Sequence, residues 1–189
     1  MDIDIDIGNR DNLLKLIKHV PASINRNSNW VKHNTGVYVT AIPRDPITGN
    51  ATIDYQEAED LGYVKLDILN QSVYERVKSA DHLDKLMATE PRWDMLQYKE
   101  FVEQVVHINN HYSILKEMPE PVDSIPRLMM FLAIIRPAKR YLIGKSWKTV
   151  SQTIWDKPSD NSYHFKKSHS AAYAHLVKVH MNLLCGLTD

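Results

Sequence analysis

Hydrophobic and polar residues alternate strictly at the start of the chain, where the segment DIDIDI occupies residues 2–7. This alternation predicts a strand with one apolar face and one face of aspartates. Residues 30–42 and 61–69 are rich in β-branched and aromatic residues, and we expect a strand in each. A turn-forming cluster at 43–50 precedes a further predicted strand at 51–55, which would complete a hairpin. The first third of the chain therefore predicts a small sheet.

Helical spacing of apolar residues dominates the rest of the chain. We expect a short helix over 10–20 to end at Pro21, and the polar residues 22–30 to form a loop. Later segments repeat apolar residues every three or four positions, and they predict helices over 72–87, 94–118, 124–137, 141–155 and 168–187. A strand-rich front half followed by a helix-rich back half predicts an α+β fold.

Size and composition narrow this picture. A chain of 189 residues can bury a real core, and we expect one compact domain in which a helical region over 93–189 packs on a sheet region over 1–92. The longest apolar run, at 128–135, is too short to span a bilayer, and no signal-peptide pattern stands at the start. We therefore expect a cytoplasmic protein that does not contact membranes. The lone Cys185 excludes an internal disulfide and is expected to be a buried helix residue.

Charge is balanced overall but uneven along the chain. The net charge is zero, which argues against a generic nucleic-acid-coating protein. Residues 136–180, however, hold nine lysines and arginines against two aspartates, with tryptophans and tyrosines interleaved. Such a segment suits contact with phosphates and bases. It equally suits solvated helix faces with aromatic residues buried behind them, and composition alone leaves both interpretations open.

Carboxylates on two of the predicted strands suggest a metal site. Asp67 stands among strand-forming apolar residues, where an unpaired carboxylate is costly to bury. Two neighbouring strands that each carry aspartate on the same face can bring three carboxylates together, two from one strand at i, i+2 spacing and a third from elsewhere. Such a cluster is tolerable when divalent cations neutralise it, since Mg²⁺ prefers carboxylate and phosphate oxygens. The alternative is an acidic N-terminal tail and a separately capped Asp67.

Five blocks of sequence resemble, in the same order, motifs of a known enzyme family. The blocks are MDIDIDI with NRDNLLKLI near the start, HNTGVYVTAIP at 33–43, ATIDYQEAEDLGYVKLDILN at 51–70, MFLAIIRPAK at 130–139 and FKKSHSAAYAHLVKVHMNLL at 165–184. They are similar to the PDIDxDF, HAGGVVIAP, LGLVKFDFLG, ALYRPGP and FNKSHAAAYAL segments of the bacterial family C DNA polymerases, the polymerase III alpha subunits. The blocks together cover most of the chain.

The resemblance implies a palm with the nucleotidyltransferase fold of DNA polymerase β type, built on a small mixed sheet. By motif position it implies Asp2, Asp4 and Asp67 as catalytic ligands of Mg²⁺ or Mn²⁺, with Asp6 as a second choice. In two-metal catalysis such ions activate a primer 3′-hydroxyl and neutralise charge on the triphosphate.

The resemblance also implies a surface for DNA or the incoming nucleotide in the helical half. Arg136 matches the arginine of the RPGP motif, and Lys166, Lys167 and His169 fall on the NKSH stretch. Lysine and arginine are natural phosphate partners. His33 matches the histidine of the HAGG motif, to which we assign no role.

Departures from the family pattern leave two functions open. The GRGSxxGSLV segment, which holds the nucleotide triphosphate in family members, is absent, and RPGP has become RPAK. We expect a minimal polymerase III alpha-like enzyme that transfers nucleotides from deoxynucleoside triphosphates to a DNA 3′ end in replication. A second protein chain could then supply the triphosphate site. The alternative is a non-polymerising, palm-derived protein that binds DNA or a replisome component.

The segment HINNH raises the separate possibility of a zinc site. His107 and His111 stand one helical turn apart if the segment is helical. The glutamate of HExxH is missing and no third ligand suggests itself, so we expect both to be surface histidines on a helix.

Overall fold

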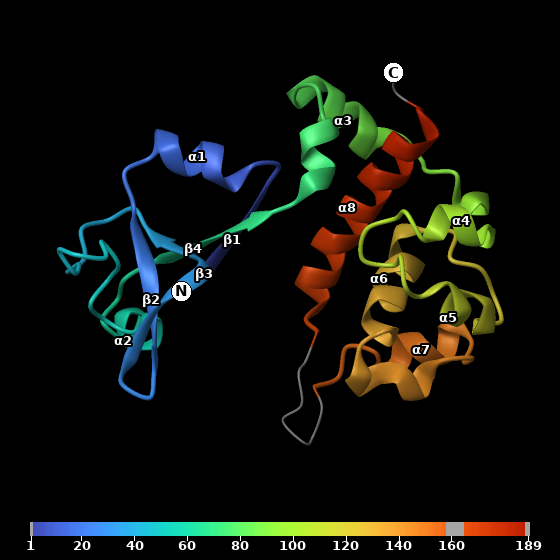
Figure 1. Cartoon of the computed structure of the whole chain (residues 1–189). Coiled ribbons are helices and arrows are strands. Elements are labelled where there is room, and N and C mark those ends of the chain that lie inside the picture. Colours follow the sequence, from blue (N-terminus) through green and yellow to red (C-terminus); the bar gives the residue numbers. More distant parts are fainter. Residues whose placement is uncertain (1, 158–164, 188–189) are drawn as a thin grey trace. The chain divides into compact units, whose positions relative to one another are not determined.

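The computed structural model describes residues 2–157 and 165–187 (Figure 1). The chain divides into two compact units, Met1–Arg76 and Val77–Asp189. The first unit holds the sheet and a small core around Ala22 and Tyr38, and the second is helical with a larger core. No helix in the described part of the chain combines the length and apolar content needed to cross a membrane.

Four strands of the first unit form one mixed sheet. They are β1 (Asp2–Ile7), β2 (Val20–Arg26), β3 (Asn29–Tyr38) and β4 (Lys65–Asn70), in the spatial order β1-β4-β3-β2. β1 runs parallel to β4, whereas the β4–β3 and β3–β2 pairs are antiparallel. The α+β fold with a small mixed sheet is therefore confirmed, and so are the strands predicted at 2–7, 30–42 and 61–69, which are β1, β3 and β4.

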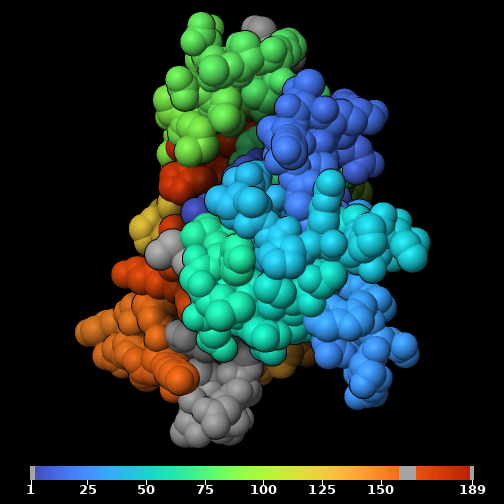
Figure 2. Space-filling model, turned by 90° about the vertical axis from the view of Figure 1, so that its left-hand side faces the viewer, coloured from blue at the N-terminus to red at the C-terminus, as the bar shows by residue number. Residues whose placement is uncertain are grey.

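The expected loop at 22–30 is wrong, because most of it forms β2 and the turn to β3. The helix predicted over 10–20 is α1 (Arg10–Leu16), which is capped by the Asn9 side chain and ends before Pro21. Pro21 lies in β2 at a register irregularity, where a strand tolerates a missing N–H. Asn27 and Ser28 both have positive φ, as a two-residue hairpin turn requires. In Figures 1 and 2 this turn and α1 lie at opposite ends of the first unit.

The predicted strand at 51–55 is also wrong. Two isolated bridges, Arg44 with Ala51 and Ser23 with Asp54, replace it. Asp54 instead caps a helix that the pattern did not predict, α2 (Tyr55–Asp60), by accepting a hydrogen bond of 2.9 Å from the Gln56 N–H. Capping by aspartate supplies the partner that the first turn of a helix lacks, so a local hydrogen bond decides this segment over β propensity.

The second unit consists of short helices around one long helix. Their bounds are α3 (Ala80–Ala88), α4 (Lys99–Val102), α5 (Tyr112–Glu117), α6 (Ile125–Ile134), α7 (Trp147–Thr153) and α8 (Lys167–Cys185). Within the described residues, the second unit also contains the 3₁₀ helices η2 (Trp93–Gln97) and η3 (Pro137–Leu142), while η1 (Ser72–Arg76) ends the first unit. The predictions of α6 and α8 are confirmed.

Three longer predicted helices are interrupted. The segment 94–118 is divided among η2, α4 and α5, and the turns between α4 and α5 contain His107, whose φ of 66° lies outside the right-handed helical region. The segment 141–155 breaks at Gly144, which has φ 76°. The segment 72–87 divides where Ser79 caps the start of α3 by accepting from the His82 N–H.

Buried polar side chains join the helices of the second unit. The Asn182 amide on α8 donates to the carbonyl oxygens of Leu86 and Thr89 at the end of α3, each at 2.9 Å. The Lys139 ammonium group donates to the carbonyl oxygens of Thr153 and Asp156 at the end of α7, each at 2.8 Å. Lys139 is therefore a buried cap and not a surface cation of the basic segment.

Candidate functional site

The pairing of β1 with β4 brings two of the expected ligands together. The register of the parallel pair places Asp4 beside Asp67, Asp2 beside Lys65 and Asp6 beside Leu69. Directly paired residues of neighbouring strands project from the same face of the sheet. Asp4 and Asp67 therefore share a face. Asp4 is exposed to solvent, whereas Asp67 is only 9% exposed and is therefore nearly buried.

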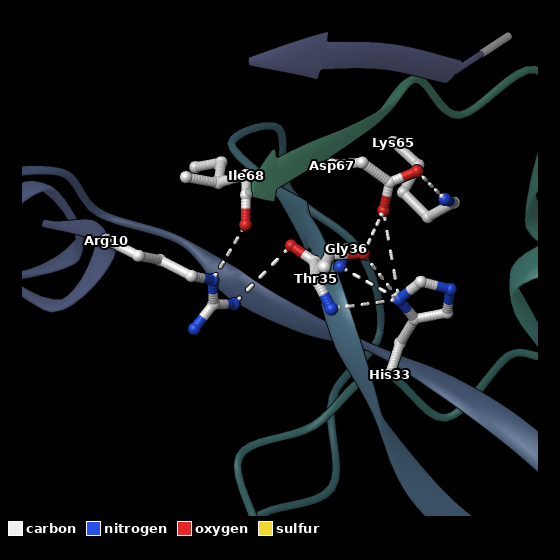
Figure 3. Close-up of polar contacts among 7 residues, drawn as sticks. All are labelled: Arg10, His33, Thr35, Gly36, Lys65, Asp67 and Ile68. Carbon is white, nitrogen blue, oxygen red and sulfur yellow. Dashed lines mark hydrogen bonds and ion pairs between the residues drawn. The ribbon is translucent and has the colours of Figure 1, made fainter. Parts of the chain in front are cut away.

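Both oxygens of the Asp67 carboxylate are held by neighbouring side chains (Figure 3). The Lys65 ammonium group forms an ion pair with Oδ2. The Thr35 hydroxyl donates to Oδ1 at 2.8 Å, and His33 Nδ1 lies 3.8 Å from the same oxygen. Asp67 is thus fixed in one orientation by residues of β3 and β4.

The charge state of Asp67 follows from these neighbours. Burial by itself would raise the pKa of Asp67, but the hydrogen bonds from Lys65 and Thr35 and the positive charge of Lys65 outweigh it and hold the pKa below its ordinary value. Asp67 is therefore a carboxylate at neutral pH. It presents a negative charge and oxygen donors, which is the state that a hard cation binds.

His33 is oriented by the backbone of β3. Its Nδ1 accepts from the Gly36 N–H at 2.9 Å and from the Thr35 N–H at 3.3 Å. An Nδ1 that accepts two backbone hydrogen bonds carries no proton in the neutral ring, which places the proton on Nε2. The ring also packs edge-on against Tyr55, with centroids 5.2 Å apart. His33 thus acts here as a backbone acceptor beside Asp67 and does not donate through Nδ1.

The space occupied by the Lys65 side chain is available because residue 36 is glycine. The lysine is 4% exposed, and its ammonium group lies 5.5 Å from the centre of the Tyr55 ring. A Cβ added at Gly36 would come within 2.7 Å of the Lys65 side chain and 3.1 Å of the Ala22 Cβ. Gly36 therefore leaves the room that the buried ion pair needs.

Arg10 fastens the other end of the same strands. Its guanidinium donates to the Ile68 carbonyl oxygen at 3.1 Å and to the Thr35 carbonyl oxygen at 3.4 Å (Figure 3). The Arg10 N–H also donates to the Asn70 side chain at 2.9 Å. Because these bonds join α1 to β3 and β4, Arg10 holds the strand that carries Thr35 against the strand that carries Asp67.

The other two aspartates of β1 are Asp2, expected as a metal ligand, and Asp6, the second choice for that role. Asp2 lies in register with Lys65, and its side chain lies outside the part of the chain that the structure describes. Burial and the charge of Asp4 raise the pKa of Asp6, while a hydrogen bond from Gln71 lowers it. Among the described side chains, no group of three or more His, Cys, Asp or Glu residues lies close enough together to hold a metal ion. Of the expected ligands with described side chains, Asp4 and Asp67 are in register on one face of the β1–β4 pair.

The predicted phosphate-binding residues gather in the second unit. Arg136 caps η3 and lies with its guanidinium carbon 4.8 Å from the centre of the Phe165 ring. Lys166 caps α8 and Lys167 begins it, and both are exposed. His169 is exposed on the first turn of α8, with its ring 6.4 Å from that of Tyr173. These residues therefore surround the start of α8.

Sequence reasoning did not identify Lys65, Thr35 and Arg10 as parts of the first site. Lys65 had a usable signal, because residues two apart on a strand share a face, and Lys65 stands two positions before Asp67. Thr35 and Arg10 had none, since their contacts depend on how β3 and α1 meet β4.

Comparison of the chain with protein-family models, with curated proteins and with solved structures gives no match. The resemblance to family C polymerases therefore rests on the order of the sequence blocks alone.

Proposed function

We propose that the protein is a small, Mg²⁺-dependent nucleotidyltransferase that adds deoxynucleotides to a DNA 3′ end, with a palm like that of family C polymerases. The observation that carries the proposal is the β1–β4 register, which sets Asp4 beside Asp67 on one face of a mixed sheet. Paired carboxylates on neighbouring strands, completed by substrate phosphates, are a suitable donor set for Mg²⁺.

Each residue of the site has a defined task in this proposal. Asp4 and Asp67 would hold the cation, with Asp2 as a third donor from the same strand as Asp4. When bound, the cation supplies charge neutralisation at the phosphate and at the attacking hydroxyl. Lys65 keeps Asp67 ionised and Thr35 fixes its orientation, so the carboxylate is aligned before substrate arrives.

The substrate's phosphates need cationic partners as well. The exposed Lys166, Lys167 and His169 and the half-buried Arg136 are proposed to meet DNA or the deoxynucleoside triphosphate. A second protein chain is proposed to supply the triphosphate cradle that the missing glycine- and serine-rich segment would otherwise form.

The test is extension of a labelled primer–template with deoxynucleotides and Mg²⁺ or Mn²⁺, with and without a cell extract that supplies partner chains. Asp4→Asn and Asp67→Asn should each reduce extension about a hundredfold or more, because each removes a charge that acts on the transition state. The control is Asp60→Asn, which changes an exposed carboxylate of α2 and should leave extension unchanged. Wild-type protein that neither extends a primer under any of these conditions nor binds Mn²⁺ would overturn the proposal.

One observation favours a second function, a DNA-binding protein without transferase activity. The charge of Asp67 is already balanced by Lys65, so the first unit needs no metal ion to be stable. This alternative expects DNA binding that survives Asp4→Asn and Asp67→Asn, together with no shift of the melting temperature in millimolar Mn²⁺. The melting experiment therefore separates the two functions.

A further inference from the structure

Among the described side chains of the second unit, four polar atoms are buried without a hydrogen-bond partner: Nε2 of His107, Nε of Arg136, Nδ1 of His175 and Oδ1 of Asn182. The first two belong to side chains that share one aromatic stack. Leaving a buried polar atom unpaired is costly, and a guanidinium N–H always carries a proton to donate. The His107 and Arg136 atoms can therefore each take a partner that the described part of the chain does not supply.

Aromatic packing fixes the side chains that carry these atoms. The His107 ring stacks on Tyr173, with centroids 4.3 Å apart and planes at 27°. Tyr173 in turn stacks on Phe165 at 5.7 Å, and the Arg136 guanidinium lies over the other ring of that pair, Phe165, at 4.8 Å. One continuous stack from α8 and its approach thus holds both His107 and Arg136.

The backbone at and before His107 is also fixed by its surroundings. His107 has φ 66°, which is uncommon for a residue with a side chain. The preceding Val106 N–H donates to His180 Nδ1 on α8 at 3.0 Å. A strained residue held by its surroundings is typical of a functional position.

The surroundings of the stack are cationic. Burial lowers the pKa of His107, and the nearby charge of Arg136 lowers it further. Burial also lowers the pKa of His111, followed by the charges of Arg136 and Arg140. No ion pair joins Arg136 or Arg140 to a carboxylate within the described ranges, so their positive charge is not balanced there.

We propose that His107 and Arg136 form a binding site for a phosphate group, with Phe165 and Tyr173 as its rigid support. The Arg136 Nε–H donates to one phosphate oxygen, and His107 takes up a proton and donates through Nε2 to another. The phosphate belongs to a nucleotide or to a nucleic-acid backbone. The assignment of this phosphate to a nucleotide or a nucleic acid rests on the proposed transferase function. The site itself does not involve Asp4 or Asp67.

The experiment is a titration of the full chain with inorganic phosphate, a deoxynucleoside triphosphate without metal, and a single-stranded oligonucleotide. Arg136→Gln and His107→Gln should each weaken phosphate binding about tenfold, since each removes one charge-assisted hydrogen bond. Lys148→Gln, which changes an exposed cation of α7, should leave the affinity unchanged. Circular dichroism establishes that the variants are folded.

A second readout separates binding from packing. The His107 ring proton signals in NMR should titrate at higher pH with phosphate present, and this shift should vanish in Arg136→Gln. Tighter binding of the triphosphate than of the oligonucleotide identifies a nucleotide site, and the reverse identifies a nucleic-acid site. Equal binding by wild type and Arg136→Gln, or no binding of any of the three ligands, overturns the proposal. Asp67→Asn should retain phosphate binding. Failure of the transferase test therefore does not decide whether His107 and Arg136 bind phosphate.

Discussion

The Lys65 ammonium group and the Asp67 carboxylate form an ion pair on one face of β4, two residues apart and almost out of contact with water. A buried ion pair contributes little net stability compared with apolar residues, but removal of one partner leaves the other charge uncompensated. The charge state of Asp67 and the metal binding proposed for it are therefore both coupled to Lys65.

Lys65→Met should destabilise the first unit by about 2–3 kcal/mol at pH 7, because Asp67 is left nearly buried without its counter-charge. Urea unfolding measures this loss. If Asp67 binds a divalent cation, millimolar Mn²⁺ should recover more stability in Lys65→Met than in wild type. Lys32→Met, an exposed change on β3, is the control and should behave like wild type. If Lys65→Met lowers the free energy of unfolding no more than the control does, the ion pair contributes little to stability.

Acidification should weaken the folded state through Asp67. Its pKa is lower in the folded chain than in the unfolded chain, so its contribution is fully present above the unfolded pKa of about 4 and is lost as pH falls through the folded value. Unfolding free energies measured from pH 6 down to pH 2 should fall less steeply in Asp67→Asn than in wild type. Parallel pH profiles of the two proteins would contradict this assignment.

Asp6 should have the opposite effect on stability. Burial and the charge of Asp4 raise its pKa in the folded chain, so ionisation of Asp6 opposes folding at neutral pH. Asp6→Asn is therefore expected to increase the melting temperature at pH 7 and to have a smaller effect near pH 3, where the carboxyl is already protonated. A lower melting temperature at pH 7 would indicate that the Gln71 hydrogen bond outweighs the repulsion.

Lys139→Met should destabilise the second unit by about 2–4 kcal/mol. The substitution keeps most of the buried volume but removes the hydrogen bonds to the Thr153 and Asp156 carbonyl oxygens, each made by a charged donor. Thermal or urea unfolding followed by tryptophan fluorescence measures the change. The matched control is Lys145→Met, an exposed lysine between η3 and α7, which should shift stability by less than about 0.5 kcal/mol.

The sequence predicted those parts of the fold that depend on alternation or on strong helical periodicity. The Asp-Ile alternation gave β1, and the apolar runs gave α6 and α8. The register of Asp4 with Asp67 agrees with the expectation of two neighbouring strands that carry aspartate on the same face, whereas the choice of Asp4 among the aspartates of β1 comes from the family resemblance. Each of these predictions rests on a pattern repeated over several residues, which single local contacts do not overturn.

The features that were missed depend on single contacts. Pro21 looked like a helix terminator but lies inside β2, and the cap Asp54 starts a helix where β-branched neighbours suggested a strand. Periodicity predicts one helix over 94–118, whereas α4 ends at Val102 and the turns before α5 include the left-handed backbone of His107. The spacing of HINNH predicts a surface position for His107, whereas its ring stacks on Tyr173, because a contact with a residue far along the chain leaves no trace in local spacing.

The parallel pairing of β1 with β4 also has a consequence for the timing of assembly. β1 is the first strand of the sheet to leave the ribosome, yet its hydrogen-bonding neighbour β4 is the last. The β2–β3 hairpin can form as soon as its own residues emerge, whereas the two carboxylates meet only after the largest loop of the unit has closed. A nascent chain that ends before β4 would therefore carry Asp4 without Asp67 beside it, and newly made protein would assemble this pair of carboxylates only at the final step of folding of this unit.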